Sequence, residues 1–180
     1  MNDIAFCADI FRFPKCKPYS ERALACLLWA LIYADESYLQ GTNLTIPPLY
    51  SSGIYWQEEH PQGRTACPEG DGQEQFLGIR QIRNQGFADC EDIASWRCAE
   101  LRLGRVPPTR GLPPFAGHPK PTVFPPPYPL SPAGPDVWPA IFQRPTAPGV
   151  ITIHVIVFWP DGYFEDPSRV LGMGGARKYG

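Results

Sequence analysis

Apolar residues recur at helical spacing near the start of the chain. Four leucines repeat at intervals of three and four: Leu24, Leu27, Leu28 and Leu31. This spacing predicts a helix over about residues 20–40 with one buried face. Ser20 suits its N-cap and Gly41 its end. Cys26 lies within this helix, and the simplest prediction is that it packs in the core.

A second helical pattern begins at Cys90 and ends near Gly104. Asp89 suits the N-cap, with a carboxylate that can accept a bond from a first-turn amide, and Asp92 stands where a capping box has Glu or Gln. The apolar side chains of this helix are Ile93, Trp96, Leu101 and Leu103. Cys90 therefore falls at about the first helical position, where free amides and the helix dipole favour a thiolate.

Near the end of the chain, the pattern of side chains is that of a strand instead of a helix. Residues 150–159 are rich in β-branched and aromatic side chains, and the Pro-Asp-Gly sequence that follows predicts a three-residue hairpin loop with a glycine bulge. A short second strand is expected over residues 163–166. In that register His154 and Asp166 share a face as diagonal neighbours, whereas a two-residue loop would place them on opposite faces. The turn therefore favours an Asp166 carboxylate that orients the His154 imidazole.

Two long stretches lack such patterns. Residues 42–74 are loop-rich, and their aromatic side chains Tyr50, Tyr55 and Trp56 can form either a small core under a loop or the wall of a cleft. Residues 107–149 hold fifteen of the 23 prolines, which predicts irregular or polyproline structure rather than a helix or a central strand. This segment also carries Val137, Trp138, Ile141 and Phe142. We expect part of it to lie against the domain or a partner, with a loose loop as the alternative for its middle.

The composition of the chain indicates a globular protein and argues against several classes of partner and location. The chain has 180 residues, 43% hydrophobic and 19% charged, which suits one globular domain over residues 1–180. Its net charge of −2 argues against a nucleic-acid partner, and no apolar run approaches the roughly 18–20 residues of a membrane span. The N-terminus lacks the basic start of a signal peptide, so a cytoplasmic location is expected. The six cysteines are therefore expected to be reduced rather than paired, and with no Cys-x-x-Cys we expect no metal and no cofactor.

Three motifs in a fixed order resemble the transglutaminase-like superfamily, which belongs with the papain-like thiol enzymes. They are Asp-Cys-Glu-Asp around Cys90, Leu-Arg-Leu-Gly-Arg-Val-Pro at 101–107, and His154 on a strand followed by Glu-Asp-Pro-Ser at 165–168. The version here looks like proteins of bacteriophages and bacterial mobile elements. The resemblance implies an α+β fold, with a helical N-terminal half that carries the nucleophile and packs on a small antiparallel sheet. Residues 107–149 would then be a long proline-rich insertion.

The same resemblance implies a Cys-His-Asp triad of Cys90, His154 and Asp166 that acts on an amide bond of a peptide or protein through a thioester. Water would make the protein a cysteine peptidase or amidase, and an amine would make it a crosslinking acyl transferase. A third alternative is a non-catalytic structural component of a phage particle. Trp56 and Gln85 are candidates for holding the oxyanion.

Two expectations complete this interpretation. The acidic residues Asp89, Glu91 and Asp92 crowd the thiol with negative charge, which disfavours a thiolate unless they cap the helix and point to solvent. A viral version of the protein would work in the host cytoplasm or in the particle. There, residues 107–149 would offer a surface for docking to a protein assembly.

Overall fold

The computed structural model describes residues 13–14, 21–41, 46–57, 73–74, 76–107, 122–123, 134–147 and 150–174 of the chain. They form a mixture of helices and small sheets, which confirms the predicted α+β class. The helices are α1 (Glu21–Gly41), α2 (Ile79–Gln85), α3 (Cys90–Arg102) and α4 (Pro167–Val170), with a short 3-10 helix η2 (Leu49–Ser51).

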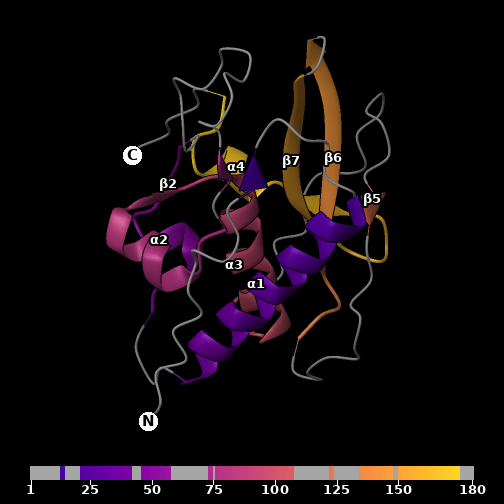
Figure 1. The fold of residues 1–180 in the computed structure, drawn as a ribbon. Helices are drawn as coiled ribbons and strands as arrows, with labels where there is room; N and C mark the ends of the chain where they lie inside the picture. Colours follow the sequence, from indigo (N-terminus) through magenta and orange to yellow (C-terminus); the bar gives the residue numbers. More distant parts are fainter. Residues whose placement is uncertain are drawn as a thin grey trace.

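The strands form three separate sheets within the described residues. Strands β5 (Thr122–Val123), β6 (Trp138–Ala147), β7 (Val150–Phe158) and β8 (Phe164–Glu165) make an antiparallel sheet in that order. Strand β2 (Tyr55–Trp56) pairs in parallel with β4 (Phe87–Ala88), and β1 (Phe13–Pro14) pairs with β3 (Gln73–Glu74). In Figure 1, α1 crosses the front of the molecule diagonally, α2 lies at the left, and the β6–β7 hairpin rises at the upper right.

Helix α1 forms where the leucine spacing predicts it. Leu24, Leu28 and Leu31 are buried and Leu27 is partly buried. Cys26, however, is exposed, so the prediction that it packs in the core is wrong. Successive residues are about 100° apart around a helix, so a residue midway between Leu24 and Leu28 points to the opposite side.

Helix α3 is buried along its whole length and forms the centre of the molecule. It packs against α1, β7 and α4, and every residue from Glu91 to Arg102 is buried. Its C-terminus closes as the sequence predicts: Gly104 has a left-handed φ of 64°, and the N–H of Arg105 donates to the carbonyl of Glu100 at 3.0 Å. Because the helix is held along its length, the position of its first residue, Cys90, is fixed relative to the core.

The proline-rich segment takes part in the sheet, which corrects one prediction. Residues 138–147 form β6, which lies between β5 and β7 although it contains Pro139 and Pro145. The two prolines are six residues apart, so the pleat turns both nitrogens toward the same side of the strand. Pairing tolerates proline at positions whose nitrogen faces away from the partner strand. In the described residues β5 pairs only with Ala140 and Ile141, so neither proline is placed against it.

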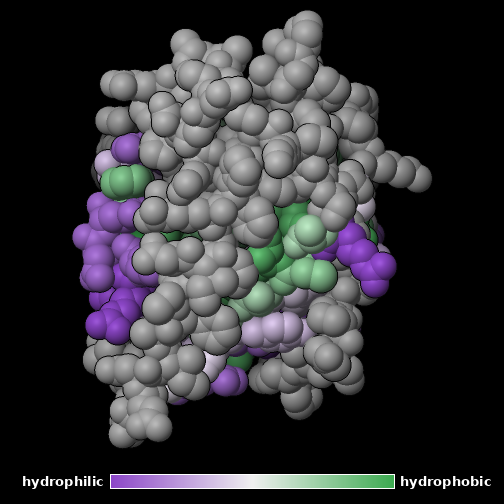
Figure 2. Space-filling model, in the orientation of Figure 1, coloured by the Kyte–Doolittle hydropathy of each residue, from purple (hydrophilic) through white to green (hydrophobic). Residues whose placement is uncertain are grey.

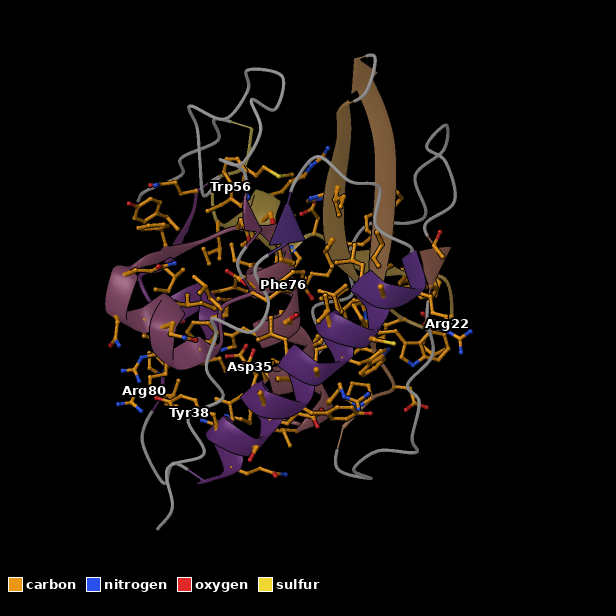
Figure 3. All side chains as sticks on the ribbon, in the orientation of Figure 1. Arg22, Asp35, Tyr38, Trp56, Phe76 and Arg80 are labelled. Atoms are coloured by element: carbon orange, nitrogen blue, oxygen red, sulfur yellow. The ribbon has the colours of Figure 1, made fainter. Side chains whose placement is uncertain are left out.

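Asp35 is a buried carboxylate between α1 and α2. It is 1% exposed, and its Oδ1 accepts the N–H of Ile79, the first residue of α2, at 2.9 Å. Figure 3 shows Asp35 on the side of α1 that faces α2. Burial raises the pKa of this carboxyl well above its ordinary value, the Ile79 N–H lowers it, and the charges of Glu100 and Glu36 raise it further.

Asp35→Asn is expected to stabilise the protein above the ordinary carboxyl pKa. The folded protein holds the Asp35 proton more tightly than the unfolded chain, so the contribution of Asp35 to stability is fully present below about pH 4 and is lost as pH rises toward the folded pKa. Asparagine keeps the acceptor for Ile79 and does not ionise. The free energy of unfolding in urea should therefore exceed that of wild type by about 1–3 kcal/mol at neutral pH, with the difference vanishing toward pH 4.

The neighbouring substitution Glu36→Gln is the matched control. Glu36 forms a buried ion pair with Arg102, whose Nε lies 2.5 Å from its Oε1, so loss of its charge should destabilise the protein instead. An Asp35→Asn variant that is less stable than wild type at neutral pH, or more stable by the same amount at every pH, would contradict this account.

Candidate functional site

Cys90 is the first residue of α3, as predicted. Helix α2 ends at Gly86, whose left-handed φ of 85° lets its N–H donate to the carbonyl of Ile82 at 2.8 Å. Strand β4 follows, and Asp89 then occupies the N-cap in an extended conformation. The Cys90 side chain is half-buried. The N-terminal amides of a thirteen-residue helix therefore meet a thiol that remains partly accessible to solvent.

His154 and Asp166 are brought together by the β7–β8 hairpin. Gly162 has a φ of 92° and donates to the carbonyl of Trp159 at 2.9 Å, which is the predicted turn. Phe158 pairs with Phe164, so the predicted register is confirmed. His154 Nε2 lies 3.0 Å from Asp166 Oδ2. Since an ionised carboxylate can only accept, Nε2 carries the proton of a neutral imidazole, and Nδ1 is its basic nitrogen.

Asp166 is held in place by more than the histidine. It is the N-cap of α4, where its Oδ1 accepts the N–H of Arg169 at 3.2 Å. The Nε of Arg169 lies 3.4 Å from Oδ2, and the Asp166 side chain is 8% exposed. Because both carboxylate oxygens have partners, the orientation of the carboxylate toward His154 is fixed.

The thiol of Cys90 lies against the strand that carries the histidine. Its Sγ is 3.7 Å from the carbonyl oxygen of Ile153, the residue before His154 in β7. A shorter contact runs to Oε2 of Glu91 at 3.1 Å, and a thiol has one hydrogen to donate. The structure thus brings the start of α3 to β7 beside His154, with Glu91 as the nearer acceptor.

The acidic residues beside Cys90 are buried, so the condition under which their charge would be screened, that they cap the helix and point to solvent, is not met. Asp89 is 6% exposed, Glu91 4% and Asp92 0%, and Asp89 makes no side-chain capping bond. Oδ1 of Asp92 accepts the N–H of Leu77 at 2.7 Å instead. This bond packs Asp92 against the segment before α2. Because all three side chains are buried, water does not screen their charge.

Trp56 lies two residues from Cys90 in the register of the parallel pair. It pairs with Ala88 of β4, and its backbone N–H donates to the carbonyl of Leu171 at 2.9 Å. Figure 3 labels Trp56 on β2. Its indole Nε1 is buried and has no hydrogen-bond partner in the described part of the chain. Trp56 therefore offers a buried donor near the start of α3.

Gln85, the other oxyanion candidate, is exposed at the end of α2. Its amide Nε2 donates to the carbonyl of Phe87 at 2.7 Å, which spans the Gly86 turn. Figure 2 shows hydrophilic side chains at the left edge, where Figure 1 places α2; exposed Arg80 and Arg83 belong to this helix. The structure thus gives Gln85 a role in supporting the turn before Cys90.

A cluster of buried charges that the sequence does not predict lies behind the site: Arg97, Glu165 and Glu100, with the partly buried hydroxyl of Tyr50 bonded to Glu165. Burial acts to lower the pKa of Arg97, but the charge and hydrogen bond of Glu165, together with the charges of Tyr50 and Glu100, outweigh it and the pKa is raised. Burial also raises the pKa of Tyr50 and of Glu100. The sequence shows charged residues at Arg97 and Glu100 within the helix and at Glu165 beside Asp166, but no local pattern shows that they pair.

Among the residues that the structure describes, no three His, Cys, Asp or Glu side chains are grouped to hold a metal ion. In the same residues, no helix is long and apolar enough to cross a membrane.

Comparison with models of known protein families, with curated proteins and with solved structures finds no match to this chain.

Cys98 is expected to resist alkylation in the folded protein, while Cys26 reacts as an ordinary exposed thiol. Burial raises the pKa of Cys98 far above its usual value, although Arg102 lowers it, so its reaction requires opening of α3. Site-resolved mass spectrometry after iodoacetamide treatment at neutral pH should show Cys98 at least ~100-fold slower than Cys26. Equal rates for the two thiols in folded protein would contradict the burial of α3.

Proposed function

We propose that this protein is a cysteine peptidase or amidase with the arrangement of the transglutaminase-like, papain-like enzymes. Cys90 is the nucleophile, His154 the general base and acid, and Asp166 the residue that orients the imidazole. The observation that carries the proposal is the hydrogen bond of 3.0 Å between His154 and Asp166. It is supported by the contact of the Cys90 thiol with Ile153, the neighbour of His154.

The reaction begins with transfer of the thiol proton to Nδ1 of His154. The thiolate attacks the carbonyl carbon of the amide, and its negative charge passes to the carbonyl oxygen. The indole N–H of Trp56 and the backbone N–H of Cys90 are the donors proposed for that oxyanion. The imidazolium then protonates the amide nitrogen, the C–N bond breaks, and the acyl group remains on sulfur as a thioester.

Hydrolysis completes the cycle with the same residues. His154 takes a proton from water, the resulting hydroxide attacks the thioester, and the Cys90 sulfur leaves and recovers its proton from the imidazolium. Asp166 stays ionised and stabilises the imidazolium in both halves of the reaction. An amine in place of water would give an amide instead of an acid.

Selective labelling of Cys90 by iodoacetamide at mildly acidic pH is the first test. A thiolate–imidazolium pair reacts below the pH at which ordinary thiols ionise, so Cys90 should react at least about tenfold faster than Cys26 near pH 6. His154→Ala should remove this advantage and Asp166→Ala should reduce it. Cys98→Ala is the control and should leave it unchanged. Equal reaction of Cys90 and Cys26 would favour the non-catalytic structural component.

The fate of the thioester is the second test. An activated ester acylates Cys90, and the products released in water and in excess primary amine are then compared. We expect the acid to predominate, with little diversion to amide at moderate amine concentration, because the proposed acceptor is water. Predominant amide formation would identify a transferase instead. Trp56→Phe, which removes the proposed oxyanion donor, should slow acylation by about 100- to 1000-fold.

A further inference from the structure

Arg97 connects α3, the helix that begins at Cys90, to β8, the strand that ends directly before Asp166. Its Nε lies 2.8 Å from Oε1 of Glu165, and its Nη2 lies 3.5 Å from Oε2. The Arg97 and Glu165 side chains are 3% and 5% exposed. Two contacts between a planar guanidinium and one carboxylate fix both the distance and the orientation of the pair.

The other neighbours of Arg97 hold this pair from the sides. Its guanidinium lies 4.7 Å from the centre of the Tyr50 ring, and the Tyr50 hydroxyl donates to Glu165. Nη1 lies 3.5 Å from Glu100, which also accepts the N–H of Leu49 at 2.8 Å. The cluster therefore joins α3, η2 and β8 in one network, in which Tyr50 is partly buried and the charged side chains are buried.

The position of this network relates it to the proposed site. Arg97 follows Cys90 by seven residues, about two turns, so both side chains lie on the same side of α3. Glu165 is the residue before Asp166. Strand β8 has only two residues, paired with Val157 and Phe158, so its pairing with β7 constrains it weakly. A shift of β8 relative to α3 would move Asp166, and with it His154, relative to Cys90.

We propose that Arg97, through Glu165, is a positioning residue that sets the place of the His154–Asp166 pair relative to the Cys90 sulfur. The inference rests on the proposed function and adds to it a residue that touches neither substrate nor reacting atoms. The side chains that face Arg97 include Glu165 from β8, Tyr50 from η2 and Glu100 from α3 itself.

Arg102 provides a matched control on the same helix. Its side chain is 3% exposed and pairs with Glu36, and its guanidinium lies 5.2 Å from the centre of the Trp29 ring. It thus resembles Arg97 in burial, charge and aromatic contact, but it connects α3 to α1 rather than to β8. Arg97→Met and Arg102→Met should destabilise the protein to a similar extent.

The test measures alkylation of Cys90 by iodoacetamide from about pH 5 to 8 in wild type, His154→Ala, Arg97→Met and Arg102→Met. Unfolding in urea of each variant identifies conditions under which all are folded. Arg97→Met should lose about ten- to a hundredfold of the rate at acidic pH and approach His154→Ala, while Arg102→Met keeps the wild-type profile. Should the methionine variants not fold, Arg97→Lys and Arg102→Lys make the same comparison. Lysine keeps the positive charge but lacks the planar guanidinium that makes two contacts with one carboxylate.

Three outcomes would overturn the inference. An Arg97 variant with a wild-type profile would remove its positioning role and leave the proposed function intact. Equal changes in the Arg97 and Arg102 variants would show an effect of stability alone. A wild-type profile identical to that of His154→Ala would overturn the proposed function and this inference together.

Discussion

Burial of a charged helix is the constraint on which the rest of the structure depends. Every residue of α3 after Cys90 is buried, including Arg97, Arg102 and Glu100. An unpaired charge at such a position would cost several kcal/mol, and removal of one partner of a buried pair costs about 3–5 kcal/mol. The partners are Glu36 on α1, Glu165 on β8 and the N–H of Leu49. Satisfying these charges therefore fixes where α1, β8 and η2 lie around α3.

The candidate site follows from the same constraint. Helix α3 begins at Cys90 because Gly86 and β4 deliver the chain to its N-terminus in an extended conformation. The β7–β8 hairpin sets His154 against Asp166 through its turn geometry. The start of α3 and the β7–β8 hairpin are each formed by residues that are close in sequence. The ion pair between Arg97 and Glu165 fixes their positions relative to each other. Local geometry thus defines each part of the site, and buried electrostatics defines their relation.

This division explains which features could be predicted from the sequence. The ends of α3 and the register of the hairpin depend on glycines with positive φ and on a three-residue loop, which are visible within a few neighbouring residues. The ion pairs of Arg97 and Arg102 join residues 68 and 66 positions apart, and no local pattern indicates them. The strand at Trp138–Ala147 is not indicated by its own residues for a different reason. Its prolines suggest irregular structure, and only its pairing with β7, which follows it directly along the chain, shows that it is a strand.

Glu91 sets the electrostatic problem that the proposed chemistry has to solve. Two unit charges about 4 Å apart interact by roughly 4 kcal/mol at an effective dielectric constant near 20, so a thiolate beside this carboxylate, whose Oε2 lies 3.1 Å from Sγ, is opposed by an energy of that size. The N-terminus of a helix stabilises a nearby negative charge by at most about 2 kcal/mol. The imidazolium of His154 has to supply the rest, so the charge pair forms only when His154 takes the proton.

Attack on a carbonyl then changes the balance in favour of reaction. The negative charge moves from sulfur to the carbonyl oxygen, away from Glu91 and toward the donors proposed for the oxyanion. A carboxylate that opposes the thiolate more than it opposes the transition state lowers the barrier between them. On the proposed mechanism, a buried acid beside the nucleophile is therefore compatible with catalysis, because it acts mainly on the state that reacts.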